Sequence, residues 1–148
     1  MSVQTGADRR IVVGVDGSPA SVDALRWAVG QARAQGAVVE ALTAWEYPAP
    51  TGWTVPVTVD QDLAGMARKT LDESIAAAAG AVESVEVRAV VAQGGAVQCL
   101  LDAARGAELL VVGSRGLGGF TGALLGSVSQ HCVQHAPCPV VVMRHPKN

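Results

Sequence analysis

Aromatic side chains and lysines are scarce in this chain of 148 residues. Aromatic residues make up 3% of it, so a buried core has to be built from Val, Leu, Ile and Ala. The only lysines are Lys69 and Lys147. Neither lies in a glycine-rich loop, which argues against a P-loop hydrolase, whose lysine reaches the outer phosphates. The formal net charge of −2 gives no electrostatic basis for binding nucleic acid.

Long apolar runs are also missing. No stretch approaches the ~18 apolar residues that a membrane span needs, and the polar segment Met1–Arg10 has no hydrophobic signal core. Cysteines 99, 132 and 138 are an odd number without metal-ligand spacing. We therefore expect a cytoplasmic protein with reduced thiols and no membrane segment.

His131 and His135 are four residues apart, with two of the cysteines nearby. This spacing raises the hypothesis of a zinc site. A complete set of ligands is not evident, however, and ordinary positions on a helix explain the two histidines better. We expect no metal site made from protein side chains alone.

Short apolar runs alternate with stretches of helical periodicity, in a chain that is 49% hydrophobic and 16% charged. Strands are expected at 11–15, 38–45, 85–91, 109–112 and 140–143, and helices at 19–35, 61–79, 97–104 and 127–136. This alternation predicts an α/β fold with a single five-stranded parallel sheet and helices on both faces. We expect the sheet to be doubly wound, with strand order 3-2-1-4-5. We expect a flexible N-terminus at 1–9 and a single domain at 10–148.

The glycine-rich stretch Gly113-x2-Gly116-x9-Gly126-Ser127 is the most informative part of the sequence. It follows an expected strand and leads into an expected helix. Glycines let backbone N–H groups approach an anion, and a helix start adds unpaired N–H donors and the positive end of the dipole. The pattern predicts a phosphate site. A plain surface loop or close helix–sheet packing is the alternative explanation of these glycines.

Asp16 provides a second, separate signal, because it follows the first expected strand. Ligands of doubly wound sheets bind at the carboxyl ends of the strands, where the winding reverses. If the first strand is central and the fourth is its neighbour, the loops at Asp16 and Gly113 face one crevice. Asp16 could accept ribose hydroxyls or help to hold Mg²⁺, or it could simply form an Asx turn before the helix.

From Ile11 to Arg144 the chain resembles the universal stress proteins of the ATP-binding kind. It matches their signature, Gly-x2-Gly-x9-Gly-(Ser/Thr), at Gly113, Gly116, Gly126 and Ser127. One departure is Ala96, where relatives often carry proline after the third strand. We expect that change to weaken a helix start and to leave the site intact.

The resemblance and the loop chemistry together define a candidate set of nucleotide contacts. The resemblance places Asp16 near the ribose and adenine, the backbone of Ala44 against the adenine, and Val112 and Val128 along the nucleotide. Arg115 could neutralise phosphate charge or be a solvated surface residue. The full set is Asp16, Ala44, Val112, Gly113, Arg115, Gly116, Gly119, Gly126, Ser127, Val128 and Ser129.

Two serines in this set allow a structural interpretation as well. Ser127 could add a hydroxyl to the anion site or be a plain N-cap. Ser129 could donate a hydrogen bond to a phosphate or merely occupy the first helical turn.

The sequence shows no nucleophile–base pair and no Gly-x-Gly-x-x-Gly after the first strand. We therefore expect a protein that binds ATP, with Mg²⁺ held by Asp16 and the phosphates, and no catalytic residues. The resemblance implies a regulatory role in stress responses. A slow Mg²⁺-dependent ATPase or autokinase, and a protein-interaction module that binds no nucleotide, remain open alternatives.

The last expected strand, Val140–Met143, should lie at an edge of the sheet. An apolar edge exposes unpaired backbone groups unless something covers them. Pairing with the same strand of a second copy covers both edges, so we expect a homodimer, as the resemblance also implies.

Overall fold

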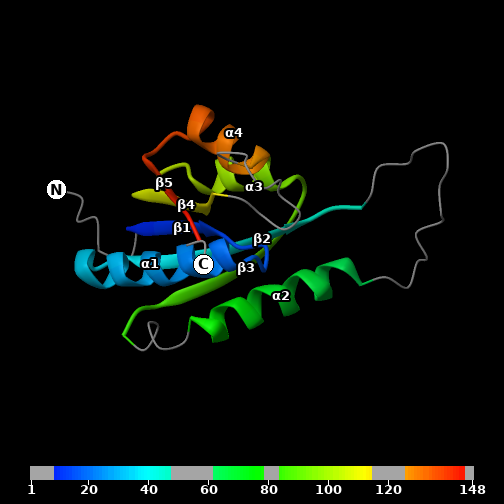
Figure 1. The fold of residues 1–148 in the computed structure, drawn as a ribbon, viewed down its shortest axis with the longest axis horizontal. Coiled ribbons are helices and arrows are strands. Elements are labelled where there is room, and N and C mark those ends of the chain that lie inside the picture. Colours follow the sequence, from blue (N-terminus) through cyan, green and yellow to red (C-terminus); the bar gives the residue numbers. More distant parts are fainter. Residues whose placement is uncertain (1–8, 48–61, 79–83, 115–125, 146–148) are drawn as a thin grey trace.

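One parallel sheet, ordered β3-β2-β1-β4-β5, organises the described part of the chain. The computed structural model describes residues 9–47, 62–78, 84–114 and 126–145 (Figure 1). The elements are β1 (Arg10–Gly14), α1 (Pro19–Gln35), β2 (Val38–Trp45), α2 (Leu63–Ala77), β3 (Val87–Gln93), α3 (Ala96–Ala103), β4 (Leu109–Gly113), α4 (Ser127–His135) and β5 (Val140–Met143). The predicted fold class and strand order are confirmed.

Helices cover both faces of the sheet, with α1 and α2 on one side and α3 and α4 on the other (Figure 1). The two layers of core meet in β1, where successive side chains point to opposite faces. Ile11 and Val13 belong to the cluster under α1 and α2, whereas Val12 belongs to the cluster under α3 and α4. All three side chains are completely buried. A central parallel strand covered twice therefore needs an unbroken apolar run.

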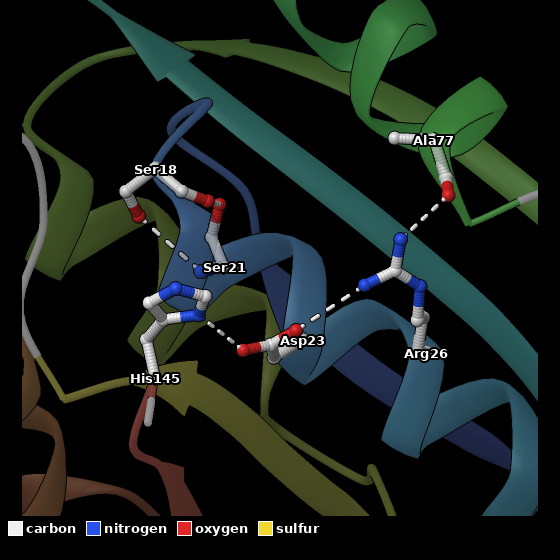
Figure 2. Close-up of polar contacts among 6 residues, drawn as sticks. All are labelled: Ser18, Ser21, Asp23, Arg26, Ala77 and His145. Carbon is white, nitrogen blue, oxygen red and sulfur yellow. Dashed lines mark hydrogen bonds and ion pairs between the residues drawn. The ribbon is translucent and has the colours of Figure 1, made fainter. Parts of the chain in front are cut away.

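The start of α1 follows its sequence signals. Ser18 is the N-cap, and its Oγ accepts a hydrogen bond from the Ser21 N–H at 3.2 Å (Figure 2). Pro19 occupies the first helical turn, and Gly36 ends the helix in the left-handed conformation at φ 69°. These are the residues that the sequence predicts for the two ends of this helix.

Several predicted boundaries are wrong by a few residues. β3 runs from Val87 to Gln93, two residues later than expected, because it pairs in register with β2 as far as Trp45. The helix expected at 61–79 begins only after Asp62, whose Oδ1 accepts from the Gly65 N–H at 2.8 Å. β3 and β5 are the two edge strands, as the sequence predicts.

The C-terminal segment crosses onto α1 after β5. His145 Nδ1 lies 2.7 Å from Oδ2 of Asp23, which also pairs with Arg26 (Figure 2). None of the helices in the described ranges has the length and apolar character needed to cross a bilayer.

Candidate functional site

Strands β1 and β2 separate at the carboxyl edge of the sheet. The Val15 N–H still donates to the Leu42 carbonyl at 2.9 Å, but the Val15 carbonyl accepts from the hydroxyl of Thr43, also at 2.9 Å. If the pairing of β1 with β2 continued, the Val15 carbonyl would accept a hydrogen bond from the Ala44 N–H. The Ala44 carbonyl would accept one from the Gly17 N–H. Gly17 instead turns away at φ 86°.

Ala44 consequently has two unused backbone groups. The β2 residues before and after it use their backbone toward β3, as in the bond from the Gly94 N–H to the Trp45 carbonyl at 2.8 Å. Strand alternation therefore aims the Ala44 N–H and C=O at the side where β1 has departed. Among the described residues neither group has a hydrogen-bond partner. The result is one donor and one acceptor, side by side, at the carboxyl edge of the sheet.

Asp16 follows at the end of β1 and forms an Asx turn. Its Oδ1 accepts from the Ser18 N–H at 2.9 Å, and its own N–H donates to Ser21 Oγ at 3.3 Å. The structural interpretation of Asp16 is thus confirmed, but Oδ2 has no partner within the described ranges, and the residue is exposed. The turn fixes the carboxylate and leaves one oxygen for a ligand.

Gly113 is needed for close packing. Its φ is not among the positive values of the described glycines. A Cβ atom there would lie 2.9 Å from Ala20 Cβ and 3.1 Å from the Ser21 nitrogen. The physical role of this glycine is therefore to let β4 approach the start of α1, which corresponds to the packing alternative named above.

The start of α4 is tied to the end of β4 through Ser114. The Ser114 carbonyl accepts from the Gly126 N–H at 2.7 Å and from the hydroxyl of Ser129 at 2.9 Å. Ser129 is buried, and its hydroxyl also lies 3.0 Å from the Gly126 carbonyl. This hydroxyl proton is engaged by backbone carbonyls, so Ser129 acts here as a clamp between strand and helix.

The N-cap of α4 is Gly126, and the expectation of Ser127 as a possible N-cap is wrong. Gly126 has the extended conformation of a cap, with φ −73° and ψ 168°, which places Ser127 at the first helical position. The N–H groups of Ser127, Val128 and Ser129 precede the first intrahelical bond, which runs from Gln130 to Gly126. No described residue accepts from them. Three bare donors thus stand at the positive end of the helix dipole.

These features share one edge of the sheet. The carboxyl ends of β1, β2 and β4 are neighbours, and Ser114 holds α4 there. Of the predicted residues, this edge carries Asp16, Ala44, Val112, Gly113, Gly126, Ser127, Val128 and Ser129. Arg115, Gly116 and Gly119 lie outside the described residues and remain predictions from the sequence.

Sequence reasoning missed Thr43 and Ser114. A threonine inside an otherwise apolar strand is a detectable signal, since a buried hydroxyl must find a partner. Ser114 has no comparable signal, because it acts through its backbone carbonyl, a group that every residue has.

The thiols and the imidazoles of α4 lie in ordinary surroundings in the described part of the chain. Burial raises the pKa of Cys132, and burial together with the carboxylates of Asp102 and Glu46 raises that of Cys99. His131 and His135 stack on α4 with ring centroids 6.3 Å apart. In the part of the chain that the structure covers, no group of three or more potential ligands could hold a metal ion.

A twisted parallel sheet with an open polar edge and a bare helix start defines the doubly wound class of α/β ligand-binding proteins. The model of the universal stress protein family matches residues 8–144. This chain belongs to the universal stress protein family.

Relatives and solved structures agree with this assignment. Universal stress protein Rv2624c of Mycobacterium tuberculosis is 33% identical over 92% of this chain, and a universal stress protein of Mycolicibacterium smegmatis is 39% identical over 90%. The chain spans about half the length of these curated relatives, 48% and 45% respectively. A universal stress protein solved in complex with cAMP is 29% identical, with a TM-score of 0.66 over 91% of this chain and 95% of that one.

Proposed function

We propose that this protein binds ATP at the carboxyl edge of its sheet and serves as a nucleotide-dependent regulatory module of the stress response. The unpartnered N–H and C=O of Ala44 carry the proposal, because they face the same edge as the bare amides of α4. A donor and an acceptor on one residue of a strand match the N1 acceptor and the 6-amino donor of adenine. The half-buried Val128 provides apolar surface for the nucleotide, and Val112 belongs to the buried cluster against which Val128 packs.

The phosphates would lie at the start of α4. The three free N–H groups, the Ser127 hydroxyl and the helix dipole are suited to an anion. Gly116, Gly119 and Arg115 would complete the loop around the triphosphate. The free oxygen of Asp16 would accept a ribose hydroxyl or help to hold Mg²⁺, whose preferred ligands are carboxylate and phosphate oxygens.

The solved relative in complex with cAMP supports an adenine nucleotide as the ligand class. cAMP and ATP share the base and differ in the phosphates, so the base site favours neither. The glycine-rich signature and the helix start favour the longer phosphate chain. A homodimer through Val140–Met143 is part of the proposal, since β5 is an edge strand.

Titration calorimetry with ATP, cAMP and GTP, each with and without MgCl₂, tests the proposal. We expect a heat of binding with ATP that is larger when Mg²⁺ is present, and a smaller one with cAMP. GTP should give no heat, because its 6-oxo group and N1–H do not match the donor and acceptor that Ala44 offers. If cAMP gave heat and ATP gave none, cAMP would replace ATP as the proposed ligand. Absence of heat with every adenine nucleotide would contradict the function itself.

Ser127→Ala and Gln130→Ala form a matched pair on α4. Both residues are exposed, but the Gln130 N–H is already bonded to Gly126. We expect Ser127→Ala to weaken ATP binding by about tenfold, as for a hydrogen bond to a charged group, and Gln130→Ala to leave it unchanged. Equal effects of the two changes would contradict a phosphate site at this helix start.

A further inference from the structure

The Thr43 hydroxyl donates to the Val15 carbonyl in place of the backbone N–H that would donate if the strands stayed paired. The Val15 carbonyl is buried together with its residue and must be satisfied. Continued pairing would satisfy it with the Ala44 N–H. The Thr43 hydroxyl does so instead, at 2.9 Å, from a side chain that is 6% exposed.

We propose that Thr43 is a positioning residue that selects adenine by keeping the Ala44 N–H free for the base. This inference rests on the proposed function and adds a determinant of base specificity to it. Without the Thr43 hydroxyl, the Val15 carbonyl lacks a partner, and the nearest donor in ladder geometry is the Ala44 N–H. The sheet then gains one bond and the base loses its donor.

A free Ala44 N–H distinguishes adenine from hypoxanthine. N1 of adenine is an acceptor and needs the Ala44 N–H, whereas N1 of hypoxanthine carries a hydrogen and conflicts with it. A free Ala44 N–H therefore favours ATP and disfavours ITP. If the Val15 carbonyl accepts from the Ala44 N–H, ATP loses a hydrogen bond to the protein. ITP no longer has its N1–H opposed to a free N–H, so the affinities for ATP and ITP become more similar. The mismatch at the 6-oxo group of ITP is the same in both proteins and cancels.

Thr43→Val and Thr43→Ser make the matched pair for the test. Valine keeps the shape of the side chain and removes the hydroxyl, whereas serine keeps the hydroxyl. Calorimetry with ATP and ITP gives the ratio of their dissociation constants in each protein. We expect the ratio of ITP to ATP to fall by about tenfold in Thr43→Val, in proportion to the hydrogen bond lost, and to stay near the wild-type value in Thr43→Ser.

A purely structural role of Thr43 would weaken both nucleotides equally and leave the ratio unchanged, which would overturn the inference. A ratio that falls in both variants would overturn it as well, because serine retains the hydroxyl. If wild-type protein binds neither nucleotide, the proposed function fails first, and the amide measurement decides on Thr43 separately.

Hydrogen exchange of the Ala44 amide provides that separate measurement, and its first part uses the wild-type protein alone. In nucleotide-free wild-type protein we expect this amide to exchange at least about tenfold faster than that of Leu42, its neighbour on the same side of β2, because only Ala44 lacks a ladder partner. Thr43→Val should slow the exchange at Ala44. A protected Ala44 amide in nucleotide-free wild type would overturn the inference.

Discussion

Gly113 at the end of β4 lies directly against Ala20 in the first turn of α1. A Cβ atom at position 113 would stand 2.9 Å from Ala20 Cβ and 3.0 Å from the Ala20 carbonyl carbon. Main-chain atoms of a helix cannot yield as a flexible side chain can. This contact places the Asp16 loop and the end of β4 next to each other at the carboxyl edge of the sheet.

Gly113→Ala is expected to lower the free energy of unfolding by about 1–3 kcal/mol, the usual cost of overpacking. Gly30→Ala is the control, since a Cβ atom at this exposed helical position would have no atom of the described residues within 4 Å. Alanine should stabilise α1 there by roughly 0.5–1 kcal/mol. Urea unfolding followed by circular dichroism measures both changes, and a neutral Gly113→Ala would show that β4 and α1 are not in close contact.

Asp16→Asn separates the turn from the ligand role of this residue. Asparagine can still accept from the Ser18 N–H, so we expect the free energy of unfolding to stay within about 0.5 kcal/mol. The loss of the carboxylate should weaken Mg²⁺–ATP binding by about tenfold.

Asp16→Ala is the companion variant, and it should lose about 1 kcal/mol of stability in addition, because the Asx turn goes too. Thermal unfolding and calorimetry measure the two effects. If Asp16→Asn bound ATP as tightly as the wild type, forming the turn would be the only role of Asp16.

Arg26 joins α1 to the end of α2. Its Nη2 donates to the Ala77 carbonyl at 2.9 Å, and its Nη1 lies 3.3 Å from Asp23 Oδ1 (Figure 2). We expect Arg26→Leu to lower the free energy of unfolding by about 1 kcal/mol, since a carbonyl at a helix end loses its donor.

Arg68→Leu is the matched control for Arg26. Among the described residues, Arg68 pairs with Asp72 alone, four residues on in the same helix, and both side chains are exposed. Such pairs contribute roughly 0.3–0.5 kcal/mol. Urea unfolding of both variants in the same buffer compares them, and an equal loss would mean that the link between the helices adds nothing.

The thiols should react slowly at neutral pH. Burial raises the pKa of Cys99, Cys132 and Cys138, so each holds less thiolate at pH 7 than a free cysteine does. Reaction with Ellman's reagent should accelerate as the pH rises from 7 to 9.5. Cys132 is completely buried and should react only after unfolding in urea. Three thiols that titrate rapidly in the folded protein at pH 7 would contradict this packing.

The homodimer prediction rests on the edge strand β5. The backbone of Val141 faces β4, whereas the Val142 N–H faces the free side of the strand. Val142→Pro therefore removes one N–H from the free edge and adds a ring that obstructs pairing. We expect the variant to be a monomer by light scattering where the wild type is a dimer. An unchanged dimer would place the interface elsewhere, and a wild-type monomer would refute the prediction directly.

The sequence by itself determined the α/β class, the strand order and both ends of α1. The class and the helix ends depend on local signals, namely an apolar run such as 11–13, a cap such as Ser18, or a glycine such as Gly36. The strand order is the one expected of a doubly wound sheet as a whole. Pairing with β2 moved the third strand to Val87–Gln93. The Gly126 N–H donates to the Ser114 carbonyl, and Gly126 is the cap of α4. Such boundaries depend on neighbours that are distant in the sequence.

Only the tertiary structure decided why particular residues matter at the site. Gly113 serves contact with α1, Ser129 clamps the Ser114 carbonyl, and Thr43 donates to the Val15 carbonyl where β1 and β2 separate. The physical reason is that a buried polar group must be satisfied by whichever donor the fold brings within reach. Periodicity and spacing describe the preferences of each segment, whereas the competition between donors arises only after the segments have packed together.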